Sequence, residues 1–197
     1  LVGSEMCIRD RYLTMAGWPL KQTDKYVLAK ETAKEVIESG KYSLLPRYED
    51  LWKEATCGDD TEHILALNHT IVGSSNYGIS YMAMEENAGA WSDYLADSCF
   101  YERYPEDTRK AFNFVTKFGE GKRAKDFKVS EMRSPAINKY RDYGGIEPLS
   151  AQTSGITPIY RYADVLLIYA EAQNKADKGP DALASVSYTH LRAHETL

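Results

Sequence analysis

Residues 159–176, with the sequence IYRYADVLLIYAEAQNKA, constrain the fold of this chain more than any other segment does. Apolar residues recur here with a helical period on more than one face, which is typical of a helix packed between other helices. Alanines at four positions of the segment allow a neighbouring backbone to approach closely. Pro158 precedes the segment and Gly179-Pro180 follows it, so we expect one helix over residues 159–176. The simplest interpretation is a core helix.

A second helical pattern covers residues 25–39, with Asp24 or Thr23 as its expected N-cap and Gly40 as the left-handed residue after its end. Residues 12–17 read as the last turns of a preceding helix that stops before Trp18-Pro19. Two antiparallel helices joined by a short loop form the unit of a helical repeat. The apolar stripe of the second helix consists of Tyr26, Ala29, Ala33, Val36 and Ile37.

The region between these helices has no sustained helical period. We expect a short helix at 48–54, a strand at 63–68, and a long loop at 70–104 that is rich in Gly, Ser, Asn and aromatic residues. We also expect a turn at 104–109 that leads to a strand at 112–115, and a basic hairpin or loop at 119–135. A short strand should then cover 137–140, and another loop should cover 144–158. A loop as long as 70–104 is usually functional or disordered, and its many aromatic residues argue against disorder.

Composition excludes several classes of function. The net charge of −5 argues against a nucleic-acid-binding protein, and no run of 18 apolar residues is present that would span a membrane. Cys57, His63, His69 and Cys99 lack the close paired spacing of zinc ligands, so we expect no metal and no cofactor. A disulfide between Cys57 and Cys99 remains open, although two buried free thiols are the favoured interpretation.

Both ends of the chain differ from its interior. Residues 1–11 (LVGSEMCIRDR) and 186–197 (VSYTHLRAHETL) resemble translated read-through of sequencing adapters. We therefore expect these two segments to be artefacts, and we leave them out of the functional reasoning. Because each segment carries equal numbers of positive and negative residues, the interior keeps the net charge of −5.

Two segments of the interior resemble a known family. Residues 161–172 (RYADVLLIYAEA) resemble a helix of the SusD/RagB family, and the residues around Gly40-Lys41-Tyr42 resemble the third tetratricopeptide-like unit of that family. The resemblance implies a mainly α fold of tetratricopeptide-like helical repeats, with a long loop-rich excursion and a few short β-strands. Residues 12–185 would be a partial domain of this kind, made of a helical repeat (12–45), the excursion (46–158) and the start of the next repeat (159–185).

The resemblance also implies a function. SusD/RagB proteins are outer-membrane lipoproteins of Bacteroidetes that bind oligosaccharides without catalysis and deliver them to a TonB-dependent, SusC-like transporter. We therefore expect a nutrient-binding protein that faces the outside of the cell and is lipid-anchored in its full-length parent, since this chain shows no lipid-attachment motif. Nucleic acid is not an expected partner. Because the earlier repeats are missing, we expect the isolated chain to be unstable or to aggregate.

The loop at 70–104 offers the chemistry that a neutral glycan requires. Sugar rings present C–H surfaces that pack on flat aromatic faces, while their hydroxyl groups bond to amides and carboxylates. The family provides no fixed motif for these contacts, and a satellite core under the loop is the competing interpretation for each aromatic residue. The predicted ligand-binding residues are Trp91, Tyr77, Tyr81, Tyr94, Tyr101, Asn76, Asn87 and Asp93.

A catalytic role is one alternative to simple binding. Glu85, Glu86, Asp93 and Asp97 surround Trp91, but a glycosidase needs two carboxylates fixed about 5–9 Å apart, and no catalytic motif is present, so we expect no enzyme. A helical-repeat scaffold or a peptide-binding member of the family is the main alternative, and it would place exposed aromatic residues along the repeat groove. The pair Arg161 and Asp164 is expected to fix the organising helix by an ion pair or a cap.

Overall fold

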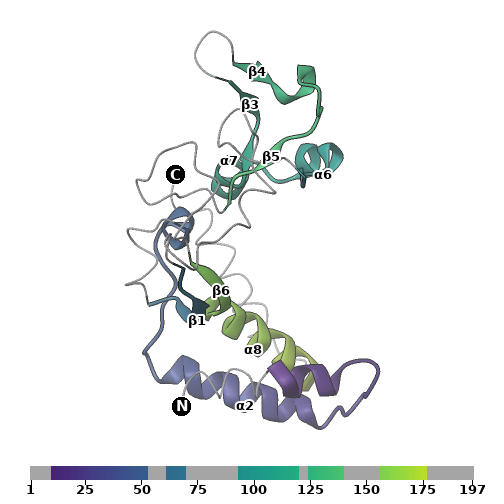
Figure 1. The fold of residues 1–197 in the computed structure, drawn as a ribbon. Helices are drawn as coiled ribbons and strands as arrows, with labels where there is room; N and C mark the ends of the chain where they lie inside the picture. Colours follow the sequence, from purple (N-terminus) through teal and green to yellow (C-terminus); the bar gives the residue numbers. More distant parts are fainter. Residues whose placement is uncertain (1–9, 53–60, 70–92, 120–123, 140–155, 177–197) are drawn as a thin grey trace. The chain divides into compact units, whose positions relative to one another are not determined.

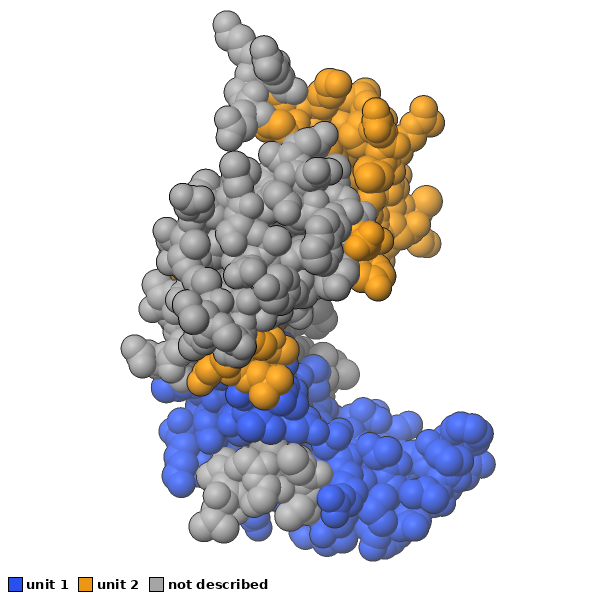
Figure 2. Space-filling model, in the orientation of Figure 1, with its two compact units in different colours: residues 1–46, 60–66, 158–197 blue, residues 47–59, 67–157 orange. Residues whose placement is uncertain are grey.

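The computed structural model of the chain describes residues 10–52, 61–69, 93–119, 124–139 and 156–176. The chain divides into two compact units, which Figure 2 shows in different colours. Unit 1 contains residues 1–46, 60–66 and 158–197, and unit 2 contains residues 47–59 and 67–157. Within the described ranges, no helix is both long enough and apolar enough to cross a membrane.

Unit 1 is built on two long helices, α2 (Lys25–Glu38) and α8 (Tyr162–Ala176), which lie against each other (Figure 1). A shorter helix covers residues 10–16, so the prediction of a helix that ends before Trp18-Pro19 is confirmed. Ala29 and Ala33 are fully buried on α2, which allows close packing against α8. The buried core of this unit consists of Ala33, Val36, Leu44, Tyr162, Val165, Leu166 and Ile168.

The helix predicted at residues 159–176 begins three residues later than expected. Residues Thr157–Arg161 form strand β6, which pairs with strand β1 (His63–Leu67), and α8 starts only at Tyr162. The strand that we expected at 63–68 is thereby confirmed. Helical period alone could not reveal this boundary, because the partner strand lies almost a hundred residues earlier in the chain.

Arg161 and Asp164 fix the start of α8, as predicted. The Asp164 carboxylate accepts a hydrogen bond from the backbone N–H of Arg161 at 2.8 Å, three residues earlier in the chain. The Arg161 guanidinium in turn forms an ion pair with Glu62 at 3.3 Å. The cap bond and the ion pair both stabilise the junction between β6 and α8.

The two ends of α2 differ in how well the sequence predicted them. Gly40 has a positive φ of 62°, as expected for the residue that follows a helix, and a residue with a side chain would be strained there. Asp24 occupies the N-cap position, but it has helical backbone angles and its side chain makes no cap bond, so its predicted capping bond is wrong. The alternative cap, Thr23, stays a prediction. The Asp24 carboxylate instead forms an ion pair with Lys25 at 3.0 Å.

Within its described residues, unit 2 contains short elements only. The helices described there are the 3-10 turn η1 (Tyr48–Leu51), α6 (Ser98–Arg103), α7 (Thr108–Asn113) and the 3-10 turn η3 (Phe127–Val129). Strand β2 (Phe114–Val115) pairs antiparallel with β5 (Ala136–Ile137), and β3 (Lys117–Phe118) pairs antiparallel with β4 (Lys125–Asp126). Phe118, Phe127 and Ala136 form a buried cluster, which we call the unit 2 core.

Several expectations for this region need correction. The loop predicted over 70–104 contains α6 near its end, and the strand predicted at 112–115 begins only at Phe114, because α7 occupies the residues before it. The helix predicted at 48–54 is a 3-10 turn over 48–51, and the strand predicted at 137–140 begins one residue earlier and covers only Ala136–Ile137. Of residues 119–135, which we expected to form a hairpin or loop, Lys125–Asp126 form strand β4, and its partner β3 (Lys117–Phe118) lies before the predicted range.

Candidate ligand-binding site

The described end of the predicted ligand-binding loop runs along strand β5. Leu95 forms an antiparallel bridge with Ala136, and the backbone N–H of Ala96 donates to the Pro135 carbonyl at 3.0 Å. Ala136 also pairs with Val115 of strand β2. Leu95, Ala136 and Val115 therefore form one row across three chain segments, and all three pack in the unit 2 core.

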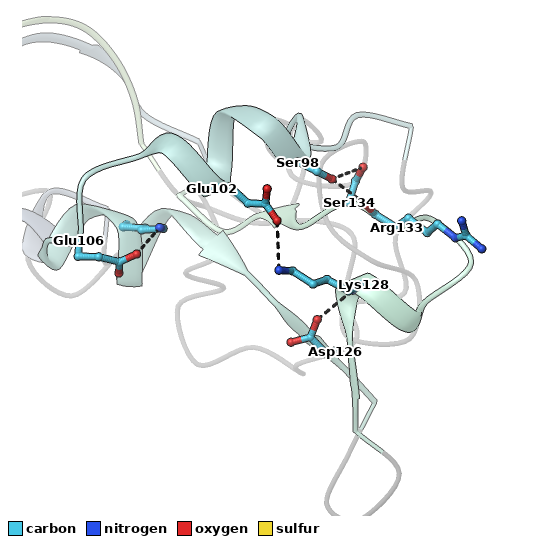
Figure 3. A network of polar contacts seen from close by, with 8 residues as sticks. Ser98, Glu102, Glu106, Asp126, Lys128, Arg133 and Ser134 are labelled. Carbon is cyan, nitrogen blue, oxygen red and sulfur yellow. Dashed lines mark hydrogen bonds and ion pairs between the residues drawn. The ribbon is translucent and has the colours of Figure 1, made fainter.

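Helix α6 follows this segment and is fixed by a set of polar contacts that Figure 3 shows from close by. The Asp97 carboxylate caps its first turn by accepting a hydrogen bond from the Phe100 N–H at 2.7 Å. The Ser98 hydroxyl donates to the Arg133 carbonyl at 2.7 Å, and Glu102 forms an ion pair with Lys128 at 3.1 Å. These contacts position α6 along residues 128–134.

One side of α6 carries aromatic rings that contact strand β2. The Tyr101 ring lies edge-on to Phe114 and Phe127, with centroids 5.2 and 5.5 Å apart. Phe100 lies edge-on to Tyr104 at 5.5 Å and to Phe114 at 6.3 Å. Edge-to-face contacts of this kind stabilise a cluster beyond its buried area.

Lys110 of α7 also contacts this aromatic cluster. Its side chain is buried, and its ammonium nitrogen lies 4.6 Å from the centre of the Tyr101 ring. The ammonium group also donates to the Tyr104 carbonyl at 3.2 Å and pairs with Glu106. Lys110 therefore ties the turn between α6 and α7 to the aromatic cluster.

The structure separates the predicted ligand-binding residues into groups. Asp93 is exposed, and Tyr94 is 63% exposed, which makes both accessible to a ligand. Tyr101 is half-buried in the aromatic cluster. The ligand-binding role of every residue in the predicted set stays a prediction; those that lie outside the described residues are Asn76, Tyr77, Tyr81, Asn87 and Trp91.

The carboxylates and thiols of the loop were the candidates for catalysis or a metal. Asp97 is engaged as the cap of α6, and Glu85 and Glu86 lie outside the described residues. Cys99 is an exposed free thiol, so the expectation of its burial is wrong, while Cys57 is also outside the described residues. Across the described part of the chain, no three His, Cys, Asp or Glu side chains gather in a geometry that would hold a metal ion.

A second group of aromatic and cationic side chains joins η1 to α7. The Arg109 guanidinium lies 5.0 Å from the Tyr48 ring centre, and the Tyr48 hydroxyl donates to Asn113 Oδ1 at 3.1 Å. Arg47, at the start of η1, donates two hydrogen bonds to Asp50 at 2.9 and 2.8 Å. The hydrogen bonds and charge of Asp50 raise the pKa of Arg47 above its ordinary value. These contacts fix local structure between η1 and α7.

The sequence did not lead us to expect that Phe100 lies on a helix and contacts Tyr104 and Phe114. Phe100 and Tyr104 are four residues apart, which places them on the same side of a helix. Asp97, three residues before Phe100, is a typical N-cap residue. These two signals together indicate a short helix with an aromatic side, but the Gly-, Ser- and aromatic-rich composition of the preceding residues favoured a loop.

Solved structures share this fold. A SusD superfamily protein from Parabacteroides distasonis is 24% identical, with a TM-score of 0.76, 96% of this chain covered and 43% of that chain. Surface glycan-binding protein A from Bacteroides thetaiotaomicron, in complex with laminarihexaose, is 19% identical over 88% of this chain and 44% of that one, with a TM-score of 0.68. A structure with a xylogluco-oligosaccharide is 23% identical over 98% and 44%, with a TM-score of 0.77.

The chain thus spans less than half the length of these solved proteins. No curated protein matches it by sequence. The family model described as "SusD family" matches residues 8–196, which is nearly the whole chain and includes parts of both end segments. The chain belongs to the SusD family.

Proposed function

We propose that this protein binds oligosaccharides at the bacterial cell surface without catalysis and delivers them to a TonB-dependent outer-membrane transporter. The observation that carries the proposal is the family match over residues 8–196, together with a protein of the same fold in complex with laminarihexaose. The exposure of Tyr94 and Asp93 is compatible with the proposal, because an aromatic ring and a carboxylate suit the apolar and the hydroxyl surface of a sugar respectively.

Calorimetric titration of an oligosaccharide panel tests the binding step. The sample is the full-length protein that carries this sequence, and the panel includes laminarihexaose, a xylogluco-oligosaccharide and a peptide mixture. We expect at least one glycan to bind, and we expect Trp91→Ala to weaken it at least tenfold, because loss of one central stacking ring removes much of the contact area. Binding that ignores this change would keep the function and move the site away from Trp91.

The same titration separates the alternatives. Binding of peptide, with no glycan bound by the folded protein, would replace the proposal with a peptide-binding or scaffold role. Release of reducing ends from a bound oligosaccharide would indicate a glycoside hydrolase. Co-purification of a TonB-dependent transporter with the full-length protein from outer membranes tests the delivery step and the location together.

A further inference from the structure

A turn in unit 1 directs its apolar side chains into solvent. It connects the helix over residues 10–16 with α2, and in Figure 1 it projects beyond the ends of both helices. Trp18 is 83% exposed, Leu20 is 57% exposed, and Pro19 between them is also exposed. We call these three residues, with the Lys21 that follows them, the tip. Because tryptophan is highly buried on average, this exposure next to an exposed leucine indicates an interaction surface.

Backbone hydrogen bonds hold the tip in place. The Lys21 N–H donates to the Gly17 carbonyl at 2.7 Å, and the Gln22 N–H donates to the Met15 carbonyl at 3.0 Å. Lys21 has a positive φ of 53°, a conformation that glycine adopts at lower cost. The turn is therefore fixed through its backbone, and its apolar side chains are presented to solvent in a defined position.

The charges around the tip are mainly positive. Residues 12–30 contain Lys21, Lys25 and Lys30 but only one acidic residue, Asp24, whose carboxylate pairs with Lys25 at 3.0 Å. The acidic residues of α2 lie farther along the helix, at positions 31, 35 and 38. The N-terminus of α2, which follows the tip, adds the positive end of a helix dipole. The tip therefore has a positive surrounding, although the whole chain carries a net charge of −5.

Resting on the outer-membrane location proposed above, we infer that the tip docks on an anionic lipid surface, with Trp18 and Leu20 among the headgroups and Lys21 against their phosphate groups. Tryptophan is enriched at membrane–water interfaces, because its ring has both an apolar body and a polar N–H group. A lysine stem lies along apolar surface while its ammonium group stays in water. Interfacial binding grows with the apolar area that is buried and with the attraction to anionic lipids, and the tip provides both.

The small size of the tip favours a lipid surface over a protein partner. A stable protein–protein interface buries about 800 Å² on each side and includes some 20–30 residues. Even with Val27 and Leu28 at the start of α2, only a few exposed apolar side chains are present here. A projecting turn enters a fluid headgroup layer without a partner of matching shape, whereas sites for small molecules are concave.

Vesicle binding by the full-length protein, expressed without lipid modification, tests the inference. Trp18→Ser and Leu20→Ser each remove an apolar contact, and Lys21→Gln removes the charge. The matched control is Leu67→Ser, because Leu67 lies on strand β1 outside the tip and is 53% exposed, close to the value for Leu20. Co-sedimentation with phosphatidylglycerol or phosphatidylcholine vesicles measures binding, and thermal unfolding confirms that each variant is folded.

We expect the wild type to bind phosphatidylglycerol vesicles at least fivefold more tightly than phosphatidylcholine vesicles. Lys21→Gln should weaken binding to the anionic vesicles about fivefold, which is the contribution of one cation near such a surface. Trp18→Ser and Leu20→Ser should weaken it at least as much, and Leu67→Ser should leave it unchanged. Equal binding to both kinds of vesicle, or an equal loss in the control variant, would overturn the inference.

Two further measurements separate the lipid from other occupants of the tip. Trp18 fluorescence that is shielded from acrylamide in the full-length protein alone would overturn the inference, because another part of the protein would then cover the tip. Self-association that Trp18→Ser abolishes, with vesicle binding unchanged, would replace the lipid with a second copy of the chain. A folded protein that binds a glycan but no anionic vesicle would overturn the inference and leave the proposed glycan binding intact.

Discussion

A single buried carboxylate organises the junction of three segments in unit 1. Glu62 is 3% exposed, accepts a hydrogen bond from the Leu45 N–H at 2.8 Å, and forms an ion pair with Arg161 at 3.3 Å. Its backbone carbonyl also accepts a hydrogen bond from the Tyr162 N–H at 2.8 Å. Glu62 therefore connects the segment after α2, the strand pair and the start of α8.

Neutralising this carboxylate should destabilise the protein. We predict that Glu62→Gln lowers the free energy of unfolding by about 3 kcal/mol, because the half-buried Arg161 guanidinium loses a buried counter-ion. The matched control is Glu38→Gln, which removes an exposed pair with Lys34 at 3.4 Å and should change stability by less than about 0.5 kcal/mol. Urea unfolding of the full-length protein measures both, and equal effects would refute a special role for Glu62.

Neighbouring aromatic residues of the loop have different surroundings, although their types are the same. Tyr94 is mainly exposed, whereas Tyr101 contacts Phe114, Phe127 and Lys110. We predicted both residues as ligand contacts from the sequence. Composition shows which residues can stack on a sugar ring, but it does not show which of them are buried. Only the pairing of residue 95 with residue 136 and the presence of α6 distinguish them.

At the scale of elements, caps decide where the short helices of unit 2 begin. Asp97 and Asp107 each accept a hydrogen bond from the backbone N–H three residues later, at 2.7 and 2.8 Å. Short helices have few internal hydrogen bonds, so one satisfied N–H group is a large share of their stability. Asp24, before the much longer α2, makes no such bond.

This difference gives a direct comparison between two aspartates. We predict that Asp97→Ala lowers the free energy of unfolding by about 1 kcal/mol through loss of the α6 cap. Asp24→Ala should change it by less than about 0.5 kcal/mol, because it removes only a surface ion pair with Lys25. Urea unfolding measures the free energy for both variants, with the unfolding signal taken from the unit that contains the substitution. A larger effect for Asp24→Ala would show that backbone capping does not control these helix starts.

At the scale of the whole molecule, the chain leaves large apolar side chains in contact with solvent. Trp18 is 83% exposed, Leu20 is 57% exposed, and Leu67 of strand β1 is 53% exposed. Solvent-exposed apolar side chains gathered into patches favour association between copies. The chain also covers less than half the length of its solved relatives.

We therefore predict that the 197-residue chain, expressed alone, aggregates or unfolds over a broad temperature range. Size-exclusion chromatography with light scattering gives the association state, and calorimetry gives the width of the transition. A monomer with a sharp, cooperative transition would contradict this prediction. Trp18→Ser and Leu20→Ser provide the internal comparison, since they should reduce aggregation if this exposed turn drives it.

The treatment of residues 1–11 and 186–197 as artefacts, and the tetratricopeptide-like repeat, also remain predictions.

The sequence by itself determined the helices whose apolar period is long, α2 and α8, and the left-handed Gly40 that follows α2. These features depend on interactions within a few turns of the chain, so local pattern is sufficient to find them. The start of α8 and the surroundings of the aromatic residues were decided by tertiary structure. Each depends on pairing between distant segments, such as β1 with β6 or Leu95 with Ala136, and a local pattern carries no information about a partner that far away.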